Sequence, residues 1–414
     1  MMQRRNLLKA LIAGGTYLKL GGLNLAWSAQ TREHYFVNIL AAGGWDTTSL
    51  CDPKGDILHS ESRGVINKYS VDAIRQAGRL RYAPLLDPNY TGVDQIDVFF
   101  QNHYPNIRVF NGINGGTNAH PVGKRLNRSG DSSTSQPDTT ALMGALKKDT
   151  KPLAYYLGSG GTTTAGTVAA TRLSDVSTLD KLANPNRYLS DTIGSEIAAQ
   201  HQLSSAATQA ALNTNADLQA MREYLEGHAN AGELNPLLNA LPTNLSSGAL
   251  KEAEIAAAAF GSGMSNSALI TLGGFDTHGS NDSRQHKSLM SYFATVNHLI
   301  SELERHGIAD RTTILLSSDF GRTPYYNVNN GKDHWTVGSS IVWSRMLPGN
   351  RVIGATNGQL KSVKINPETF EPDESGVELT PAHLHLALRK HLGISDSPLD
   401  KLFPLSTDFL DLLS

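Results

Sequence analysis

The chain has 414 residues, a hydrophobic fraction of 39% and a formal net charge of -2 at pH 7. Because its basic residues are scattered and the charge is near zero, the composition argues against nucleic acid or an anionic membrane surface as the partner. A single cysteine, Cys51, excludes an intrachain disulfide, so packing must stabilise the fold.

Residues 1–29 read as a leader rather than as part of the fold. Arg4 and Arg5 in QRRNLLK are typical of a twin-arginine export signal, and an apolar stretch follows them. Ala26 and Ser28 are small residues suited to cleavage before Ala29. The alternative is a short membrane-anchoring helix. We expect the twin-arginine export machinery as a partner and a periplasmic or secreted location.

Residues 30–414 alternate short apolar runs with helical patterns. This predicts a single α/β domain with a mostly parallel central sheet and helices on both faces. The expected strands are Glu33–Leu40, Asn106–Gly112, Leu153–Leu157, Ala268–Leu272, Thr313–Leu316, Ser339–Trp343 and Val352–Ile353. The expected helices start near Thr117 and at Asp138 or Thr139, and span Asp282–His306, which Gly307 ends, and Pro381–Leu392.

Residues 189–260 differ in composition, being rich in alanine, leucine, glutamine and glutamate. Apolar residues recur at helical spacing from Ala211 to Leu225 and again within Leu250–Ala259. We expect a helical insert in the α/β domain. A separate helical domain and a surface for a partner are the alternatives.

Three aspartates follow apolar runs in glycine-flanked loops: Asp46 in GGWDTTS, Asp276 in GGFDTHG and Asp319 in SSDFGRT. An open α/β sheet binds its ligands beyond the carboxyl ends of its strands, so we expect these side chains at one edge. His278 lies two residues after Asp276, on the same side of an extended loop, and His334 follows in DHW. These five donors predict a site for a divalent metal ion, with zinc, manganese or calcium as candidates.

Each donor has a structural alternative. Asp46 could form an Asx-turn, Asp319 could cap a helix or pair with Arg322, and His334 could be an ordinary hydrogen-bonded loop residue. These alternatives stay open at the level of the sequence.

The leader, GGWDTTS, GGFDTHG, the long helix after it, DRTTILLSSDFGRTP and DHW together resemble the exported "domain of unknown function 1501" family. The resemblance covers about residues 33–355 and is strongest over Gly273–Trp335. That family is similar in fold to the alkaline phosphatase and sulfatase superfamily, which implies metal ligands at the five positions named above. Phe320 stands where the superfamily commonly has a histidine, which argues against a second metal ion or leaves such an ion with weaker oxygen ligands only.

The resemblance also implies a nucleophile at the start of the helix after the second strand, where Thr117 stands in GGTNAH. Its hydroxyl could be activated by a cation and by the helix dipole, or it could be a plain N-cap. Thr47 and Thr48 are weaker candidates. His120 is expected to add a ligand or a proton donor, and Arg322 to bind an anionic oxygen.

These expectations combine into an exported metal-dependent hydrolase whose substrate is a small anionic ester of phosphate or sulfate. The rival is a non-catalytic binding or assembly protein that keeps the fold with a degraded site, which Phe320 favours. Cys51 precedes a proline as in a sulfatase nucleophile motif, but Gly55 replaces the arginine of that motif. We expect Cys51 to be a small packed residue.

Overall fold

A computed structural model of the chain describes residues 19–20, 23–24, 33–61, 63–173, 179–180 and 234–414. The chain divides into two compact units, residues 1–34 and residues 35–414. In the first unit, β1 (Lys19–Leu20) pairs antiparallel with β2 (Leu23–Asn24). The rest of the predicted leader, and residues 189–233 of the predicted insert, lie outside the described residues. None of the described helices is both long and apolar enough to cross a membrane.

The second unit is built on a sheet of eight strands. In spatial order they are β14 (Arg351–Ile353), β6 (Ile107–Asn114), β13 (Val337–Ser344), β10 (Thr312–Ser318), β3 (Tyr35–Ala41), β9 (Ser267–Leu272), β7 (Tyr155–Leu157) and β8 (Ala170–Thr171). Only β13 runs antiparallel to its neighbours, β6 and β10. The other pairs are parallel, so the predicted mostly parallel sheet is confirmed.

The central strands are buried because both faces of the sheet are covered. In β3, Val37 and Ile39 pack into a core on one side of the sheet. Phe36 and Leu40 pack into clusters on the other side. Successive side chains of a strand point to opposite faces, so a strand covered on both faces needs a continuous apolar run.

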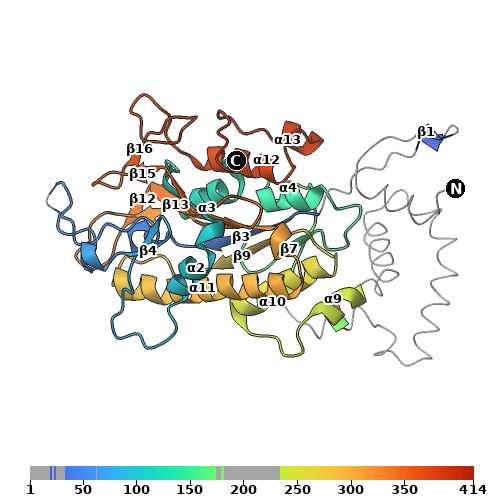
Figure 1. The fold of residues 1–414 in the computed structure, drawn as a ribbon, viewed down its shortest axis with the longest axis horizontal. Coiled ribbons are helices and arrows are strands. Elements are labelled where there is room, and N and C mark those ends of the chain that lie inside the picture. Colours follow the sequence, from blue (N-terminus) through green and yellow to red (C-terminus); the bar gives the residue numbers. More distant parts are fainter. Residues whose placement is uncertain (1–18, 21–22, 25–32, 62, 174–178, 181–233) are drawn as a thin grey trace, which may run out of the picture. The chain divides into compact units, whose positions relative to one another are not determined.

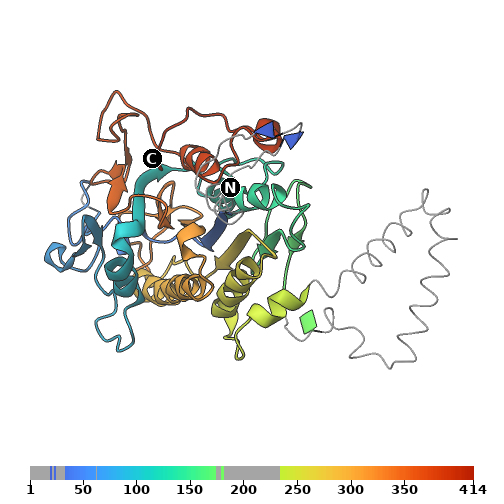
Figure 2. The same ribbon diagram turned by 45° about the vertical axis from the view of Figure 1, so that its right-hand side comes forward.

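Helices form a layer on each face of the sheet, as predicted. The helices are α2 (Gln95–His103), α3 (His120–Ser129), α4 (Thr139–Ala145), α9 (Asn235–Ala240), α10 (Gly248–Gly261), α11 (Asn281–Arg305), α12 (Pro381–His391) and α13 (Pro398–Leu402). In Figure 1, α2, α10 and α11 lie on one face, and α3, α4 and α12 lie on the other. Figure 2 shows the same layers turned, with the golden α11 below the sheet and the red α12 above it.

The longest described helix, α11, matches its predicted bounds closely. Leu289, Phe293 and Val296 are fully buried in the core that the helix shares with the sheet. Gly307, just beyond the helix, has a φ of +66°, a conformation that glycine adopts without strain. The predicted apolar face and the predicted end of this helix are both confirmed.

The last part of the predicted insert forms regular helices. α10 lies against α11 and β9, with Ala256, Ala257 and Phe260 fully buried. This stretch therefore belongs to the helical layer on the sheet. The insert as a whole, and its alternative as a separate domain, stay predictions.

The edge of the sheet that carries the site is set by three parallel strands. In β3, Ala41 is the partner of both Leu272 at the end of β9 and Ser318 at the end of β10. The loops that contain Asp46, Asp276 and Asp319 therefore leave the sheet at one edge.

Short two-stranded sheets complete the unit, and one of them returns a predicted ligand to this edge. They are β4 (Arg75–Ala77) with β5 (Leu80–Tyr82), β11 (Gly321–Arg322) with β12 (His334–Trp335), and β15 (Ala355–Thr356) with β16 (Ser362–Val363). Within the second pair, Arg322 is the direct partner of His334. The hairpin thus carries His334 back to the end of β10.

Candidate metal centre

Three imidazoles converge on the carboxylate of Asp276. Its Oδ1 lies 3.1 Å from His278 Nε2 and 3.2 Å from His334 Nε2, and its Oδ2 lies 3.6 Å from His120 Nε2. The donor atoms of His120, Asp276 and His334 all lie within 4.8 Å of one another. Ligands bound about 2 Å from one ion lie roughly 3 to 3.5 Å apart, and the three contacts to Asp276, at 3.1 to 3.6 Å, are close to this spacing.

The far nitrogen of each imidazole is anchored. His120 Nδ1 lies 2.7 Å from Asp319 Oδ2, and His278 Nδ1 lies 2.7 Å from Asp333 Oδ1. His334 Nδ1 lies 2.8 Å from the carbonyl oxygen of a loop residue just before α3. Carboxylates and carbonyls accept hydrogen bonds, so each Nδ1 donates. This arrangement leaves the Nε2 lone pairs free to bind a metal, which is the usual outer support of metal-binding histidines.

Two of these lone pairs face each other. His278 Nε2 and His334 Nε2 are 2.9 Å apart, and each ring already donates through its Nδ1. Two acceptors at this distance repel unless a cation or a proton lies between them. A bound cation, or a proton on one of the two rings, would relieve this contact.

Asp276 is held in its charged form. Burial favours the neutral carboxyl group, but the hydrogen bond and the charge of Arg322 outweigh burial and lower the pKa of Asp276 to about 2. Its side chain is nevertheless 50% exposed. The cluster therefore presents an ionised oxygen ligand to solvent at neutral pH.

Arg322 holds the loops of the site rather than facing solvent. Its side chain is 0% exposed, and Nη2 donates to Asp276 Oδ1 at 2.7 Å. Nε, Nη1 and Nη2 also donate to backbone carbonyls, those of Gly43, Gly44, Phe275 and Lys332. The predicted binding of a substrate anion by Arg322 is not supported, because its side chain is fully buried.

Asp46 does not join the cluster. Lys332 Nζ lies 2.8 Å from Asp46 Oδ2, and both side chains are fully buried. Thr48, Ser49 and Asn281 donate hydrogen bonds to the same carboxylate. Burial opposes ionisation of Asp46, but the charge of Lys332 and these hydrogen bonds give it a net pKa below its ordinary value. The Asx-turn alternative fits, since Asp46 Oδ1 accepts from the Thr48 backbone N–H.

Asp319 lies behind His120 instead of in the cluster. Its Oδ2 accepts hydrogen bonds from His120 Nδ1 and from the Gly43 N–H, at 2.7 and 3.0 Å. Its Oδ1 has no hydrogen-bond partner among the described residues. Burial raises the pKa of Asp319 against the opposing hydrogen bond of His120. Asp319 thus positions a ligand, and its predicted pairing with Arg322 is replaced by the pairing of Arg322 with Asp276.

Thr117 lies three residues before α3, which begins at His120. The N-cap is Ala119, and Thr117 Oγ1 accepts a hydrogen bond from the Ala119 N–H at 3.1 Å. The helix therefore starts later than expected, and Thr117 is not its N-cap. The next residue, Asn118, provides the carbonyl that anchors His334, so Thr117 borders the cluster without belonging to it.

Phe320 forms an apolar wall behind two of the imidazoles. The centroid of its ring lies 4.8 Å from that of His120 and 4.5 Å from that of His334. Gly44, with a φ of +85°, leaves the room for it, because a Cβ there would lie 2.8 Å from the Phe320 ring. Phe320 thus fixes the orientation of His120 and His334, besides replacing a histidine that could have bound a second metal ion.

Cys51 is buried and is not one of the donors of the histidine cluster. Burial raises the pKa of its thiol to about 12, and its Sγ lies 3.2 Å from Ser339 Oγ. A thiol with this pKa is protonated and unreactive at neutral pH. The interpretation of Cys51 as a packed residue is confirmed.

Asp333 and Lys332 were not predicted from the sequence. Asp333 precedes His334 directly, and this adjacency was a signal for a metal-site carboxylate. The carboxylate nevertheless supports His278, a residue from another loop. Lys332 gave no local signal, because its partner Asp46 lies near the other end of the chain.

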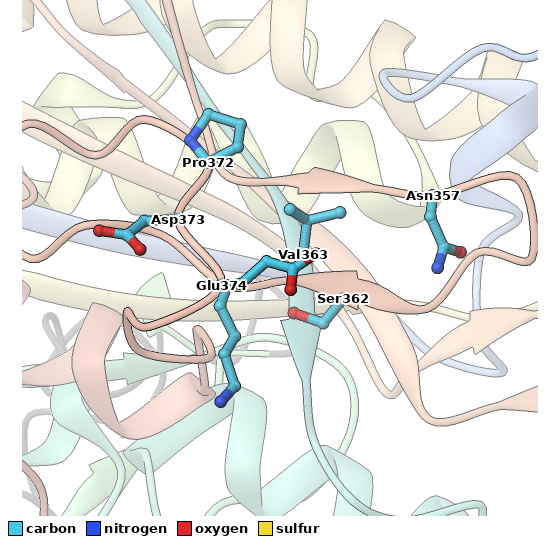
Figure 3. A pocket seen from close by; sticks show the side chains of 7 residues that line it. Asn357, Ser362, Val363, Pro372, Asp373 and Glu374 are labelled. Atoms are coloured by element: carbon cyan, nitrogen blue, oxygen red, sulfur yellow. The ribbon is translucent and has the colours of Figure 1, made fainter.

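An open cavity of about 580 Å³ lies elsewhere on the surface, beside the β15–β16 hairpin. Seven side chains line it: Asn357, Ser362, Val363, Lys364, Pro372, Asp373 and Glu374, of which Figure 3 labels six. None of them belongs to the histidine cluster, and the lining contains no imidazole.

Solved structures similar to this chain include sulfatases and alkaline phosphatases, as the predicted resemblance implies. The PsFucS1 sulfatase from Pseudoalteromonas sp. is 11% identical with a TM-score of 0.39, and the match covers 93% of this chain and 73% of that one. Ps i-CgsB in complex with k-i-k-neocarrahexaose is 8% identical, with a TM-score of 0.36 and coverage of 92% and 76%. The alkaline phosphatase from the Antarctic bacterium TAB5 is 8% identical, with a TM-score of 0.32 and coverage of 78% and 95%. At this level of similarity we draw no conclusion about activity.

No curated protein matches the chain. A family model described as "Protein of unknown function (DUF1501)" matches residues 35–368, which include every residue of the histidine cluster. This chain therefore belongs to the DUF1501 family.

Proposed function

We propose that the protein is a metal-dependent hydrolase that acts on an ester of phosphate or sulfate, with a single divalent ion at the histidine cluster. The observation that carries the proposal is the convergence of three Nε2 atoms on the ionised carboxylate of Asp276 at a half-exposed position. Anchored imidazoles with free Nε2 lone pairs and a charged carboxylate are the donors of known catalytic metal sites.

The donor set favours zinc or manganese over calcium. His120, His278 and His334 offer nitrogen and Asp276 offers oxygen, a mixture that both transition ions accept. Calcium prefers six to eight oxygen ligands, which this cluster does not provide. With Asp46 occupied by Lys332, the proposal includes one ion rather than two.

When bound, a divalent ion would supply a Lewis acid that neutralises the charge of the ester and activates a nucleophile. The side chains around the ion would orient its ligands and fix the loop of Asp276. Asp319 and Asp333 keep His120 and His278 oriented through their Nδ1 atoms. Arg322 keeps the loop of Asp276 fixed against the end of β3. Thr117 remains a candidate nucleophile.

We also propose that the protein reaches the periplasm or the exterior through the twin-arginine machinery. The pair Arg4–Arg5 supports this proposal, as does a metal centre that forms only in the folded chain. The test is the location of the protein in fractionated cells. Arg4→Lys with Arg5→Lys should retain it in the cytoplasm, and unchanged export of this variant would refute the route.

The decisive experiment compares wild type with Asp276→Asn. The substitution keeps the shape and removes the charge, so bound zinc measured by elemental analysis should fall from about one ion per chain to near zero. Hydrolysis of aryl phosphates and aryl sulfates, assayed with added zinc or manganese, should fall with it. Asp310→Asn is the control, because Asp310 is an exposed carboxylate in a surface ion pair with Arg345. Wild-type protein without bound metal or activity would refute the proposal.

A second candidate is a metal-binding protein without catalysis. Four protein donors complete a tetrahedral shell, as in structural zinc sites, whereas catalytic zinc sites keep one position open. One firmly bound zinc per chain, together with no hydrolysis of either ester class, would favour this candidate. The same experiment therefore separates the two functions.

A further inference from the structure

A phosphate or sulfate ester needs a positive partner in addition to a single metal ion, because its charge must be neutralised in a water-accessible site. The sequence offered Arg322 for this role. In the structure its guanidinium is fully buried and its donors are taken by backbone carbonyls and by Asp276. Lys332, whose carbonyl accepts a hydrogen bond from Arg322, is also fully buried and is paired with Asp46. Neither of them can reach a substrate.

Lys124 is placed differently. It lies in α3, four residues after His120, and residues four apart lie on the same face of a helix. His120 is the residue of this helix whose Nε2 faces Asp276. The side chain of Lys124 therefore starts one turn from a metal ligand, on the side of the helix that borders the cluster.

The position of α3 is fixed closely enough to keep Lys124 there. A Cβ on Gly123 would lie 2.4 Å from the backbone oxygen of Asp319, so the helix touches the end of β10 directly. Asn127 Nδ2 donates to the same oxygen at 3.0 Å. His120, Gly123 and Asn127 thus form a stripe against Asp319, and Lys124 lies at the flank of this stripe, one helical turn after His120.

Lys124 is half-buried and makes no hydrogen bond or close ion pair with any residue of the part of the chain that the structure describes. Its charge does reach the carboxylate of Asp319. Its neighbour Arg125 differs, since Arg125 Nε donates to the carbonyl of Ser132 at 2.7 Å. An ammonium group on the helix face of His120 is suited to bind a phosphate or sulfate oxyanion.

We propose that Lys124 binds the anionic group of the substrate next to the metal cluster and so selects phosphate or sulfate esters over neutral esters. This inference rests on the proposed function. It assigns to Lys124 the role that the sequence suggested for Arg322. Because an ammonium acts as a point charge, Lys124 should contribute to binding of both anions and discriminate weakly between them.

The test uses full-length, zinc-loaded protein and inorganic phosphate and sulfate as probes, with binding measured by calorimetry at low salt. Lys124→Gln keeps the length of the side chain and removes the charge, and should weaken phosphate binding by about tenfold or more. Lys124→Arg keeps the charge and should restore most of the affinity. Lys148→Ala is the control and should bind like wild type, because Lys148 is an exposed lysine in the turn after α4.

Zinc content measured on the same samples shows whether the cluster is intact, and it should be equal in wild type and Lys124→Gln. Equal phosphate affinity in these two proteins would overturn the inference, and so would wild type that binds no phosphate. The proposed hydrolase activity is assessed separately on aryl esters. If wild type binds zinc and phosphate but hydrolyses nothing, the proposed function fails while the role of Lys124 in anion binding stands.

Discussion

At the scale of single residues, the site separates side chains that could touch a metal from those that hold them. Asp276 and the Nε2 atoms of His120, His278 and His334 form the inner group. Asp319, Asp333 and Arg322 act through these residues. Carboxylate–histidine pairs orient the imidazole and raise its basicity, so the supporting residues determine the metal affinity as well.

Lys332 provides a prediction at this scale. Lys332→Met should destabilise the fold by about 3–5 kcal/mol, because it leaves the carboxylate of Asp46 buried without its partner charge. Lys332→Met combined with Asp46→Asn should recover most of this loss, since no buried charge then remains. Urea unfolding of the metal-free proteins measures both values. Equal losses in the single and the double variant would show that the ion pair is not the cause.

Phe320 affects both the number of possible metal ligands and the orientation of the imidazoles. A histidine there would offer another metal ligand, whereas the phenyl ring packs against His120 and His334 and restricts their rotation. The departure from the superfamily pattern therefore removes a donor and adds rigidity.

At the scale of elements, α12 carries polar groups into the core. His385 is fully buried and lies 2.7 Å from Thr139 Oγ1 of α4, and His391 lies 2.9 Å from Thr313 Oγ1 of β10. Burial lowers the pKa of His385 to about 3 and that of His391 to about 4. The two imidazoles are therefore neutral in the folded protein.

These histidines predict a loss of stability in mild acid. Below pH 6.5 His385 binds a proton in the unfolded chain but stays neutral in the folded chain. The free energy of unfolding therefore falls as the pH falls, and this effect ends at about pH 3 for His385. Each such histidine contributes about 1.4 kcal/mol per pH unit in this window. Urea midpoints at pH 7 and pH 5 measure the slope.

His385→Asn isolates one contribution to that slope. The asparagine does not titrate, so the difference in stability between pH 7 and pH 5 should become smaller than in wild type, even if the substitution costs stability at both values. An unchanged slope would mean that other groups control the acid response.

At the scale of the whole molecule, the cluster draws its donors from separate segments. His120 begins α3 after β6, Asp276 and His278 follow β9, and His334 arrives on the β11–β12 hairpin. No segment alone places these atoms together, so the site exists only in the folded chain. A ligand that binds only the folded state stabilises it by mass action.

Metal binding should therefore raise the melting temperature. Free zinc at 100 times its dissociation constant adds about 2.7 kcal/mol of stability. Thermal unfolding with zinc, and again after a chelator, measures the shift. Asp276→Asn should show little shift with zinc, because it lacks the charged ligand. A shift as large as that of wild type would place the bound zinc elsewhere in the molecule.

The sequence by itself determined much of the framework. The apolar runs of β3, β9 and β10 and the apolar face of α11 are local patterns, and local patterns set secondary structure. Since the ends of parallel strands share one edge, the grouping of the loops of Asp46, Asp276 and Asp319 also followed from the sequence.

Only the tertiary structure decided which side chains meet at that edge. Asp46 turns to Lys332, Asp319 lies behind His120, and Arg322 is enclosed by carbonyls. These outcomes depend on the direction of each side chain and on partners far away in the chain. Packing in three dimensions sets both, and neither the spacing of residues nor their type contains that information.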